Sequence, residues 1–166
     1  MAITTFNNET IHTVGDLPAV GSTLPPFVLA GADLSDVTPQ RFAGRTIVLN
    51  IFPSVDTDVC AMSVRRFNEM VAAWPNTTVI CTSMDLPFAL GRFCGAEGIE
   101  NVVTASAFRS DFGQTYGVTM VDGPLHGLFA RSVVVADATG KVVYAHTSPV
   151  VTEEPDYAAA AAAVLG

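Results

Sequence analysis

Apolar residues with two different spacings alternate along this 166-residue chain. Short apolar runs, partly β-branched, are typical of strands buried on both faces of a sheet, and three of them occur here: RTIVLNIF (45–52), TTVICTSMD (77–85) and NVVTAS (101–106). After the first run, apolar residues recur at roughly helical spacing over residues 59–74, and Pro75 marks the end of that segment. PFALGRFCGAEG (87–98) is a second candidate helix, weakened by Gly91. The pattern therefore predicts the order β-α-β-α-β.

The segments on either side of this unit predict two hairpins. Residues 3–14 form two short strands around Asn7-Asn8-Glu9, and residues 130–146 (ARSVVVADATGKVVYAH) form an antiparallel pair that turns at Asp137–Gly140. DVTPQRFAG (36–44) predicts a short helix, and the alanine run 158–163 predicts a short closing helix. We therefore expect an α/β protein with a thioredoxin-like fold, in which helices flank a mixed central sheet and an N-terminal β-hairpin is added.

Composition supports one folded domain over residues 1–166. Hydrophobic residues make up 49% of the chain and charged residues only 14%, which favours a compact core over disorder. The formal net charge is −8 and no cluster of Lys or Arg is present, so a nucleic-acid partner is not expected. The first ten residues lack the features of a signal peptide, and no apolar stretch approaches the roughly 20 residues of a membrane span. We expect a cytoplasmic protein without a membrane partner.

Three cysteines, Cys60, Cys81 and Cys94, are too few for a disulfide scaffold. In a reducing compartment they are consistent with buried thiols, a metal site or redox chemistry. No CxxC pair is present. The three histidines lie on separate segments without ligand spacing, so no metal site is expected.

Cys60 lies where the first apolar run gives way to the predicted helix. If Thr57 is the N-cap, Cys60 is the third helical residue, and its sulfur can face unpaired backbone N–H groups and the positive end of the helix dipole. Both would stabilise a thiolate, whereas the carboxylates of Asp56 and Asp58 would oppose it. The local sequence thus leaves a structural and a reactive role for Cys60 equally open.

The spacing Pro53-x-x-x-Thr57-x-x-Cys60 matches the PxxxTxxC signature of peroxiredoxins. Further segments resemble the bacterial thiol peroxidases, which are atypical two-cysteine peroxiredoxins, in the same order: NIFPSVDTDVCAMSVRRFNE (50–69), DLPFALGRFCGAEGI (85–99), YGV (116–118), DGPLHGLFARSVVV (122–135) and EEPDYAAA (153–160). The resemblance covers nearly the whole chain and includes the N-terminal hairpin. It favours the reactive role for Cys60.

The resemblance implies a role for each matching residue. Cys60 corresponds to the peroxidatic cysteine, which a peroxide oxidises to a sulfenic acid. Thr57 corresponds to the threonine that aligns the peroxide oxygens with the sulfur, and Pro53 to the proline that shields the site from water. Arg131 corresponds to the arginine that stabilises the thiolate and the polarised O–O bond. From the sequence alone, an arginine at a strand start is ordinarily a solvated residue.

Cys94 corresponds to the resolving cysteine, which forms an intramolecular disulfide with Cys60 that thioredoxin then reduces. We expect partial unwinding of one or both helices before this bond forms, because Gly91 and Gly95 weaken the helix around Cys94. Cys81 is expected to be an inert buried residue.

The resemblance further implies hydrogen peroxide and organic hydroperoxides (alkyl and lipid) as substrates, a homodimer, and no cofactor beyond the external thiol reductant. Many relatives have a small residue where this chain has Asp58, so the ionisation of Cys60 and the rate are in question, but not the function. An alternative is a thiol-based redox sensor that passes oxidation to a partner. The presence of Pro53, Thr57, Cys60 and Arg131 together favours the enzyme, because a relay needs no peroxide-activating pocket.

Overall fold

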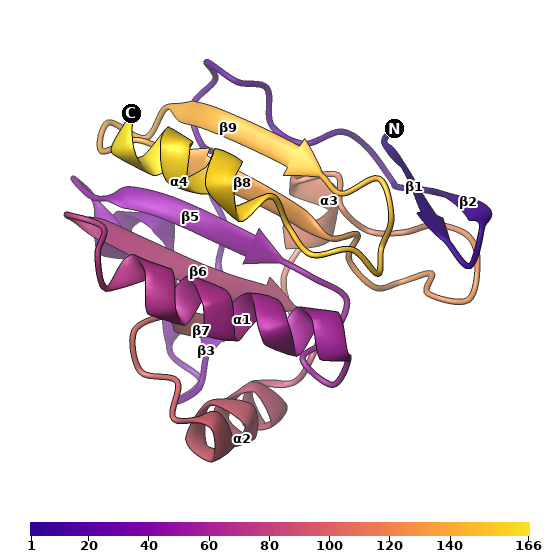
Figure 1. Cartoon of the computed structure of the whole chain (residues 1–166), viewed down its shortest axis with the longest axis horizontal. Helices are drawn as coiled ribbons and strands as arrows, with labels where there is room; N and C mark the ends of the chain where they lie inside the picture. The colour runs from indigo at the N-terminus through magenta and orange to yellow at the C-terminus, as the bar shows by residue number, and fades with distance from the viewer.

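A seven-stranded mixed sheet forms the centre of the computed structural model, which describes residues 1–166 (Figure 1). The strand order is β4-β3-β7-β6-β5-β8-β9, and β5, β6 and β7 run parallel to one another. The other neighbouring pairs are antiparallel. The strands are β3 (Leu29–Gly31), β4 (Asp36–Val37), β5 (Thr46–Ile51), β6 (Thr77–Ser83), β7 (Val103–Ser106), β8 (Ser132–Ala136) and β9 (Val142–Thr147).

Helices α1 (Asp58–Val71) and α4 (Tyr157–Leu165) cover one face of the sheet, as Figure 1 shows. Phe67 of α1 packs there with Val48 of β5 and Val79 of β6 in one buried cluster. Helix α2 (Pro87–Glu97) lies beside β7 at the lower edge of the view. No helix combines the length and the apolar character that crossing a bilayer requires.

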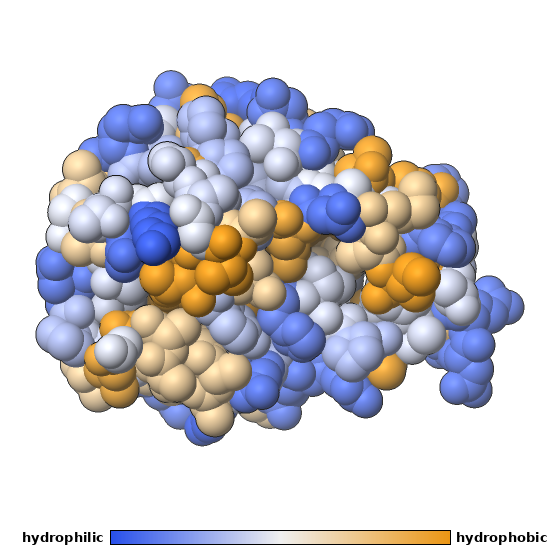
Figure 2. All heavy atoms as spheres, turned by 90° about the horizontal axis from the view of Figure 1, so that it is seen from above, coloured by the Kyte–Doolittle hydropathy of each residue, from blue (hydrophilic) through white to orange (hydrophobic).

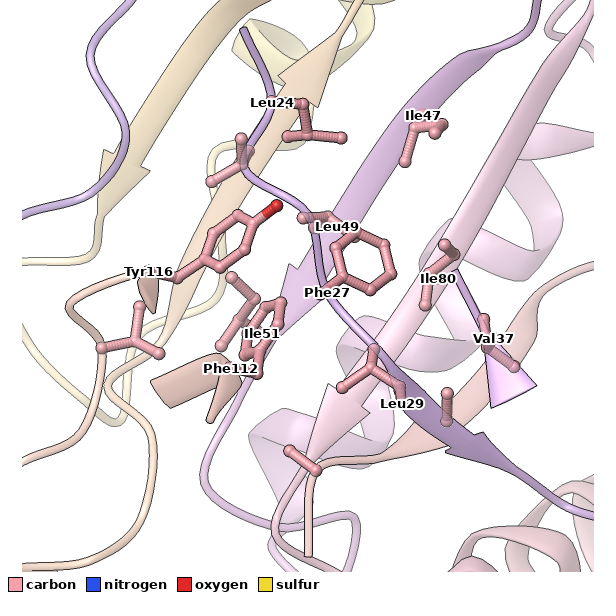
Figure 3. Packing of buried hydrophobic residues seen from close by; sticks show 14 of the residues in the cluster. Leu24, Phe27, Leu29, Val37, Ile47, Leu49, Ile51, Ile80, Phe112 and Tyr116 are labelled. Atoms are coloured by element: carbon pink, nitrogen blue, oxygen red, sulfur yellow. The ribbon is translucent and has the colours of Figure 1, made fainter. Parts of the chain in front are cut away.

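The opposite face is covered mainly by irregular chain and by the short helix α3 (Phe112–Thr115). Phe27, Phe112 and Tyr116 lie over the strands in Figure 3, and the rings of Phe112 and Tyr116 stack with their centroids 4.3 Å apart. Ile47, Leu49 and Ile51 of β5 point into this cluster, and the intervening Val48 points to the helices. The sheet is therefore buried on both faces, as the apolar runs predict.

The N-terminal hairpin is confirmed as β1 (Ile3–Phe6) and β2 (Glu9–His12), which form a separate two-stranded sheet. Asn7 and Asn8 form its turn with φ of 51° and 66°, the conformation that a two-residue type I′ turn requires. Backbone bonds from Thr5 N–H to Pro149 O at 2.9 Å and from Val121 N–H to His12 O at 2.9 Å hold the hairpin against two distant loops.

The predicted mixed sheet, flanking helices and C-terminal hairpin are all present, but the prediction for residues 36–44 was wrong in part. Asp36–Val37 form the edge strand β4, and only Pro39–Phe42 are helical, as the 3₁₀ turn η1. A two-residue strand is too short to have a recognisable period, and pairing with β3 decides its conformation.

On the face shown in Figure 2, hydrophobic patches interrupt a largely hydrophilic surface.

Candidate active site

The candidate site lies at the edge of the sheet where the parallel strands β5 and β6 end. Cys60 follows β5 by a short loop and belongs to the first turn of α1. Strand β8 runs antiparallel to β5, and its first residue, Ser132, pairs with Ile51 at the end of β5. Arg131 therefore enters the sheet at the same edge at which the chain leaves β5 for Cys60.

The Cys60 side chain is fully buried, and its sulfur contacts the guanidinium of Arg131. Arg131 Nη2 donates to Cys60 Sγ at 3.1 Å. Cys60 is the third residue of the 14-residue helix α1, as predicted, so the positive end of the helix dipole is near the thiol. The buried sulfur therefore has a permanent cation and a helix N-terminus as neighbours, and both interact favourably with negative charge.

Arg131 is only 2% exposed, unlike an ordinary arginine at a strand start. Its Nε donates to Val151 O at 3.0 Å, which fixes the plane of the guanidinium. Its Nη1 is buried without a hydrogen-bond partner. One donor thus binds the sulfur, a second binds the backbone, and a third is left for an oxygen of a bound molecule.

The loop between β5 and α1 brings Pro53 and Thr57 to the site. Pro53 is buried, and Thr57 is the N-cap residue of α1, as predicted. The Thr57 hydroxyl makes no capping bond to the helix; it donates to Ser54 O at 3.0 Å. The lone pairs of this hydroxyl are therefore not used within the helix and remain free to accept a hydrogen bond.

A cavity of about 320 Å³ brings these side chains together. Most of its other lining residues are apolar, and the lining comes from four separate parts of the chain, including the N-terminal hairpin. The lining comprises Phe6, Pro53, Ser54, Thr57, Asp58, Val59, Leu125, Leu128, Arg131, Val151 and Thr152. The cavity thus combines an apolar wall with one buried cation.

The two aspartates before Cys60 have exposed side chains. Asp56 pairs with Arg92 of α2 at 3.5 Å. Asp58 lines the cavity and is the acidic residue in the first turn of α1, where a carboxylate interacts favourably with the helix dipole. Because both carboxylates face solvent, water and salt screen their opposition to a thiolate. The effect of Asp58 on the rate stays a prediction.

None of the three cysteines is among the residues that line the cavity, and all three are free thiols. Cys60 adjoins the cavity through its contact with Arg131, which does line it. Cys94 is half-buried on α2 and donates to Thr104 Oγ1 at 3.7 Å, and burial raises the pKa of its thiol. Cys81 is fully buried in β6, as predicted, and burial raises the pKa of its thiol to about 12. The structure therefore brings Cys60 and Arg131 together but leaves Cys94 with a different partner.

The raised pKa of Cys81 predicts very slow alkylation in the folded protein. The shift from 9.0 to about 12 lowers the thiolate fraction near neutral pH roughly a thousandfold, because burial disfavours the anion. At about pH 8 we expect iodoacetamide to label Cys81 at least roughly a thousandfold more slowly than in the same chain unfolded in urea. Peptide mapping by mass spectrometry over time checks this. Equal labelling rates in the folded and unfolded chains would contradict it.

For several residues at the site, no motif or spacing in the sequence predicts that they lie there. Val151 supplies a backbone oxygen, and Phe6 and Leu125 supply apolar surface, each from a distant segment. Ser54 and Asp85, which are joined by a hydrogen bond, lie inside segments that resemble the thiol peroxidases. Apart from this resemblance, nothing in the sequence distinguishes them. The chain contains no group of three His, Cys, Asp or Glu side chains placed to hold a metal ion.

Comparison with known proteins finds relatives over the full length of the chain. The chain matches the sequence model of the Redoxin family over residues 19–161. It is 56% identical over 164 residues to the thiol peroxidase of Mycobacterium tuberculosis, and the match covers 99% of each chain. The thiol peroxidase of Corynebacterium glutamicum is also 56% identical over 164 residues, with 99% of each chain covered.

Among solved structures, the peroxiredoxin-like protein from Aquifex aeolicus superimposes on this chain with a TM-score of 0.92. The two sequences are 34% identical, and the match covers 99% of this chain and 96% of that one. This similarity confirms the predicted thioredoxin-like fold. The roles of Pro53, Thr57, Cys60, Cys94 and Arg131 stay predictions.

Proposed function

Because the chain belongs to the thiol peroxidases of the redoxin family, we propose that it reduces peroxides with the Cys60 thiolate as nucleophile. The observation that carries this proposal is the contact between the buried Arg131 guanidinium and the Cys60 sulfur at 3.1 Å. A buried cation beside a buried thiol is costly as a purely structural feature, because each group loses its hydration. It is useful where negative charge must be held on sulfur and on a leaving oxygen.

In the first step the Cys60 thiolate attacks the terminal oxygen of the peroxide. An S–O bond forms as the O–O bond breaks, and the sulfur is oxidised by two electrons to a sulfenic acid. Hydroxide or an alkoxide leaves and takes a proton from solvent. Arg131 stabilises the developing charge through its unpartnered Nη1, and no prosthetic group is required.

Thr57 and Pro53 orient the peroxide and shield it. The Thr57 hydroxyl donates its hydrogen bond to Ser54 O, so its oxygen can accept a hydrogen bond from the O–H of the bound hydroperoxide. The buried Pro53 forms part of the cavity wall and limits the access of water. Together these contacts hold the O–O bond in line with the sulfur.

In the second step the thiol of Cys94 attacks the Cys60 sulfenic acid, which gives an intramolecular disulfide and water. The dithiol of thioredoxin then reduces the disulfide and is itself oxidised. Cys94 contacts Thr104 on β7, whereas Cys60 contacts Arg131, and in this proposal one or both helices locally unwind before the sulfurs meet. Ion pairs from Arg65 to Glu97 and from Arg92 to Asp56 are the contacts that this movement breaks.

The cavity supports a substrate range that includes organic hydroperoxides as well as hydrogen peroxide. Its wall includes Phe6, Leu125 and Leu128, which offer apolar surface to an alkyl or lipid chain, and Arg131 holds the peroxide end. Because Phe6 comes from the hairpin, residues 1–166 act as one domain in this proposal. A reducing compartment such as the cytoplasm would keep the thiols and thioredoxin ready for the next cycle.

The proposal includes a homodimer. Leu86, Phe88 and Phe108 are large apolar side chains that are 51%, 66% and 40% exposed. Their backbones are neighbours, because the Ser106 hydroxyl donates to Asp85 O and accepts from Phe108 N–H. A second copy of the chain covering this surface would remove these side chains from water.

The Cys94→Ser variant tests the second step separately from the first. We expect it to consume one peroxide per protein at a rate within about twofold of wild type, because Cys94 does not touch Cys60 or the cavity. Steady-state turnover with thioredoxin should then fall by roughly a hundredfold, because no disulfide can form. Peroxide consumption coupled to thioredoxin measures both quantities, and mass spectrometry detects the sulfenic acid.

Cys81→Ser is the matched control, since it also replaces a buried thiol but should keep nearly full turnover. Undiminished turnover in Cys94→Ser would refute the proposed disulfide and leave the first step intact. Equal loss in both serine variants would indicate a general folding defect instead of a specific role for Cys94.

A further inference from the structure

Asp85 lies two residues after the end of β6, and its carboxylate holds the loop that carries Pro53 and Thr57. Its Oδ1 accepts from the Ser54 hydroxyl at 2.7 Å, and its Oδ2 accepts from Val55 N–H at 2.9 Å and from the Ser83 hydroxyl at 2.5 Å. Asp85 makes no ion pair. Two of its three donors therefore belong to the β5–α1 loop, and none is a cation.

Ser54 passes this restraint on to Thr57. The Ser54 hydroxyl, which donates to Asp85, also accepts from Asp56 N–H at 3.1 Å. The carbonyl of Ser54 accepts from Thr57 twice, from its hydroxyl at 3.0 Å and from its N–H at 3.2 Å. A carboxylate at residue 85 thus fixes Ser54, and Ser54 fixes the direction in which the Thr57 hydroxyl proton points.

The other end of this chain of hydrogen bonds is anchored in the sheet. Asp85 N–H donates to the Ser83 hydroxyl at 3.1 Å, and the hydroxyl of Ser106 in β7 donates to Asp85 O. Both serines are buried. A positioning group is effective when rigid elements hold it, and Asp85 meets that condition through the ends of two central strands.

We propose that Asp85 is a positioning residue for the peroxide reaction, which orients the Thr57 hydroxyl by holding Ser54. Asp85 touches neither the Cys60 sulfur nor the cavity. The inference rests on the proposed roles of Cys60 and Thr57 and adds a residue that those roles require. Without the carboxylate, the β5–α1 loop loses its link to the sheet, and the Thr57 hydroxyl loses its fixed direction.

The Asp85→Asn variant tests this role. An asparagine has one acceptor oxygen. It therefore cannot accept both from the Ser54 hydroxyl, which bonds to Oδ1 of Asp85, and from the two donors that bond to Oδ2. We expect the second-order rate constant for oxidation of Cys60 by hydrogen peroxide to fall about tenfold. Alkylation of Cys60 by iodoacetamide should stay within about twofold, because that reaction needs a thiolate but no aligned Thr57. Stopped-flow fluorescence of Trp74, which packs in the same cluster as Cys60, follows the first reaction, and mass spectrometry the second.

A second variant removes the other partner of the hydrogen bond between Ser54 and Asp85. Ser54→Ala removes the hydroxyl that joins Asp85 to the loop, so it should also lower the peroxide rate constant and leave alkylation nearly unchanged. The double variant should be no slower than the slower single variant, because both changes break one chain of contacts. If Asp85→Asn does not fold, Ser54→Ala alone decides the question.

Asp137→Asn is the matched control. Asp137 also accepts three hydrogen bonds from a turn, two from Thr139 and one from Lys141 N–H, but it follows the end of β8 that lies away from Arg131. It should affect stability without changing either rate constant.

The inference is overturned if the peroxide and alkylation rates of Asp85→Asn fall together, or if neither falls. If wild-type Cys60 itself does not react with peroxide, the proposed function fails as well, so the two failures are distinguishable.

Discussion

Replacing Cys60 with serine is expected to abolish peroxide reduction, with a loss of about ten-thousandfold or more to the background rate. A serine hydroxyl at this position cannot supply a sulfur that is oxidised to a sulfenic acid, and it is not ionised near neutral pH. The fold around residue 60 should be unchanged, because serine is slightly smaller than cysteine and Arg131 Nη2 can donate to its oxygen. Loss of thioredoxin-coupled peroxide consumption, with unchanged circular dichroism, is the expected result.

Cys81→Ser supplies the comparison for this experiment. Both cysteines are fully buried in the same cluster of side chains, but Cys81 is contacted by Asn50 Nδ2 at 3.6 Å, not by a cation. It should keep nearly full activity, so a loss in Cys60→Ser alone points to chemistry and not to packing. Full activity in folded Cys60→Ser would end the proposal that Cys60 is the nucleophile.

Replacing Arg131 with methionine should lower the second-order rate constant for hydrogen peroxide about a thousandfold. The substitution keeps an unbranched apolar stem but removes the charge, the donor to Cys60 Sγ and the free donor Nη1. Two charge-assisted hydrogen bonds of about 2 kcal/mol each correspond to roughly that change in rate. Unfolding should also become easier by about 1–3 kcal/mol, because Val151 O loses its buried donor. Stopped-flow kinetics and urea unfolding measure the two effects.

Arg131→Lys and Arg45→Met separate the possible explanations. Lysine keeps the charge but has one nitrogen, which cannot reach both Val151 O and the sulfur in a fixed plane, so an intermediate loss is expected. Arg45 makes comparable bonds to Thr78 Oγ1 and Thr77 O, both at 2.8 Å, but at the other end of β5. Arg45→Met should therefore reduce stability and spare the rate. A similar rate loss in both methionine variants would argue against a specific role for Arg131.

Most secondary structure could be predicted because local sequence decides it. Strands β5 and β6 each contain a run of consecutive apolar residues, Ile47–Leu49 and Val79–Cys81, and such a run predicts burial on both faces of a sheet. The turn at Asn7 and Asn8 forms because asparagine tolerates positive φ. β4 was missed because two residues have no period, and its conformation depends on pairing with β3.

The sequence by itself determined the local half of the site. Thr57 starts α1 and Cys60 is its third residue, because a helix N-terminus and a residue within its first turn are set by the same short stretch of chain. The spacing to Pro53 also lies within this stretch, and it identified the family that the full-length comparisons then confirmed. Before that resemblance, the two carboxylates at 56 and 58 and the helix dipole left the reactivity of Cys60 open.

The tertiary structure decided which charges surround the thiol. Arg131 lies 71 positions after Cys60, and only the antiparallel pairing of β8 with β5 brings it to the sulfur. The same sheet edge brings Asp85 from the end of β6 to the β5–α1 loop. Asp56 and Asp58 are left in solvent, where screening weakens them, and the buried guanidinium acts at short range in a low dielectric. Distance and burial, which a sequence does not contain, place the cation against the sulfur and leave the two carboxylates, nearer in the chain, in solvent.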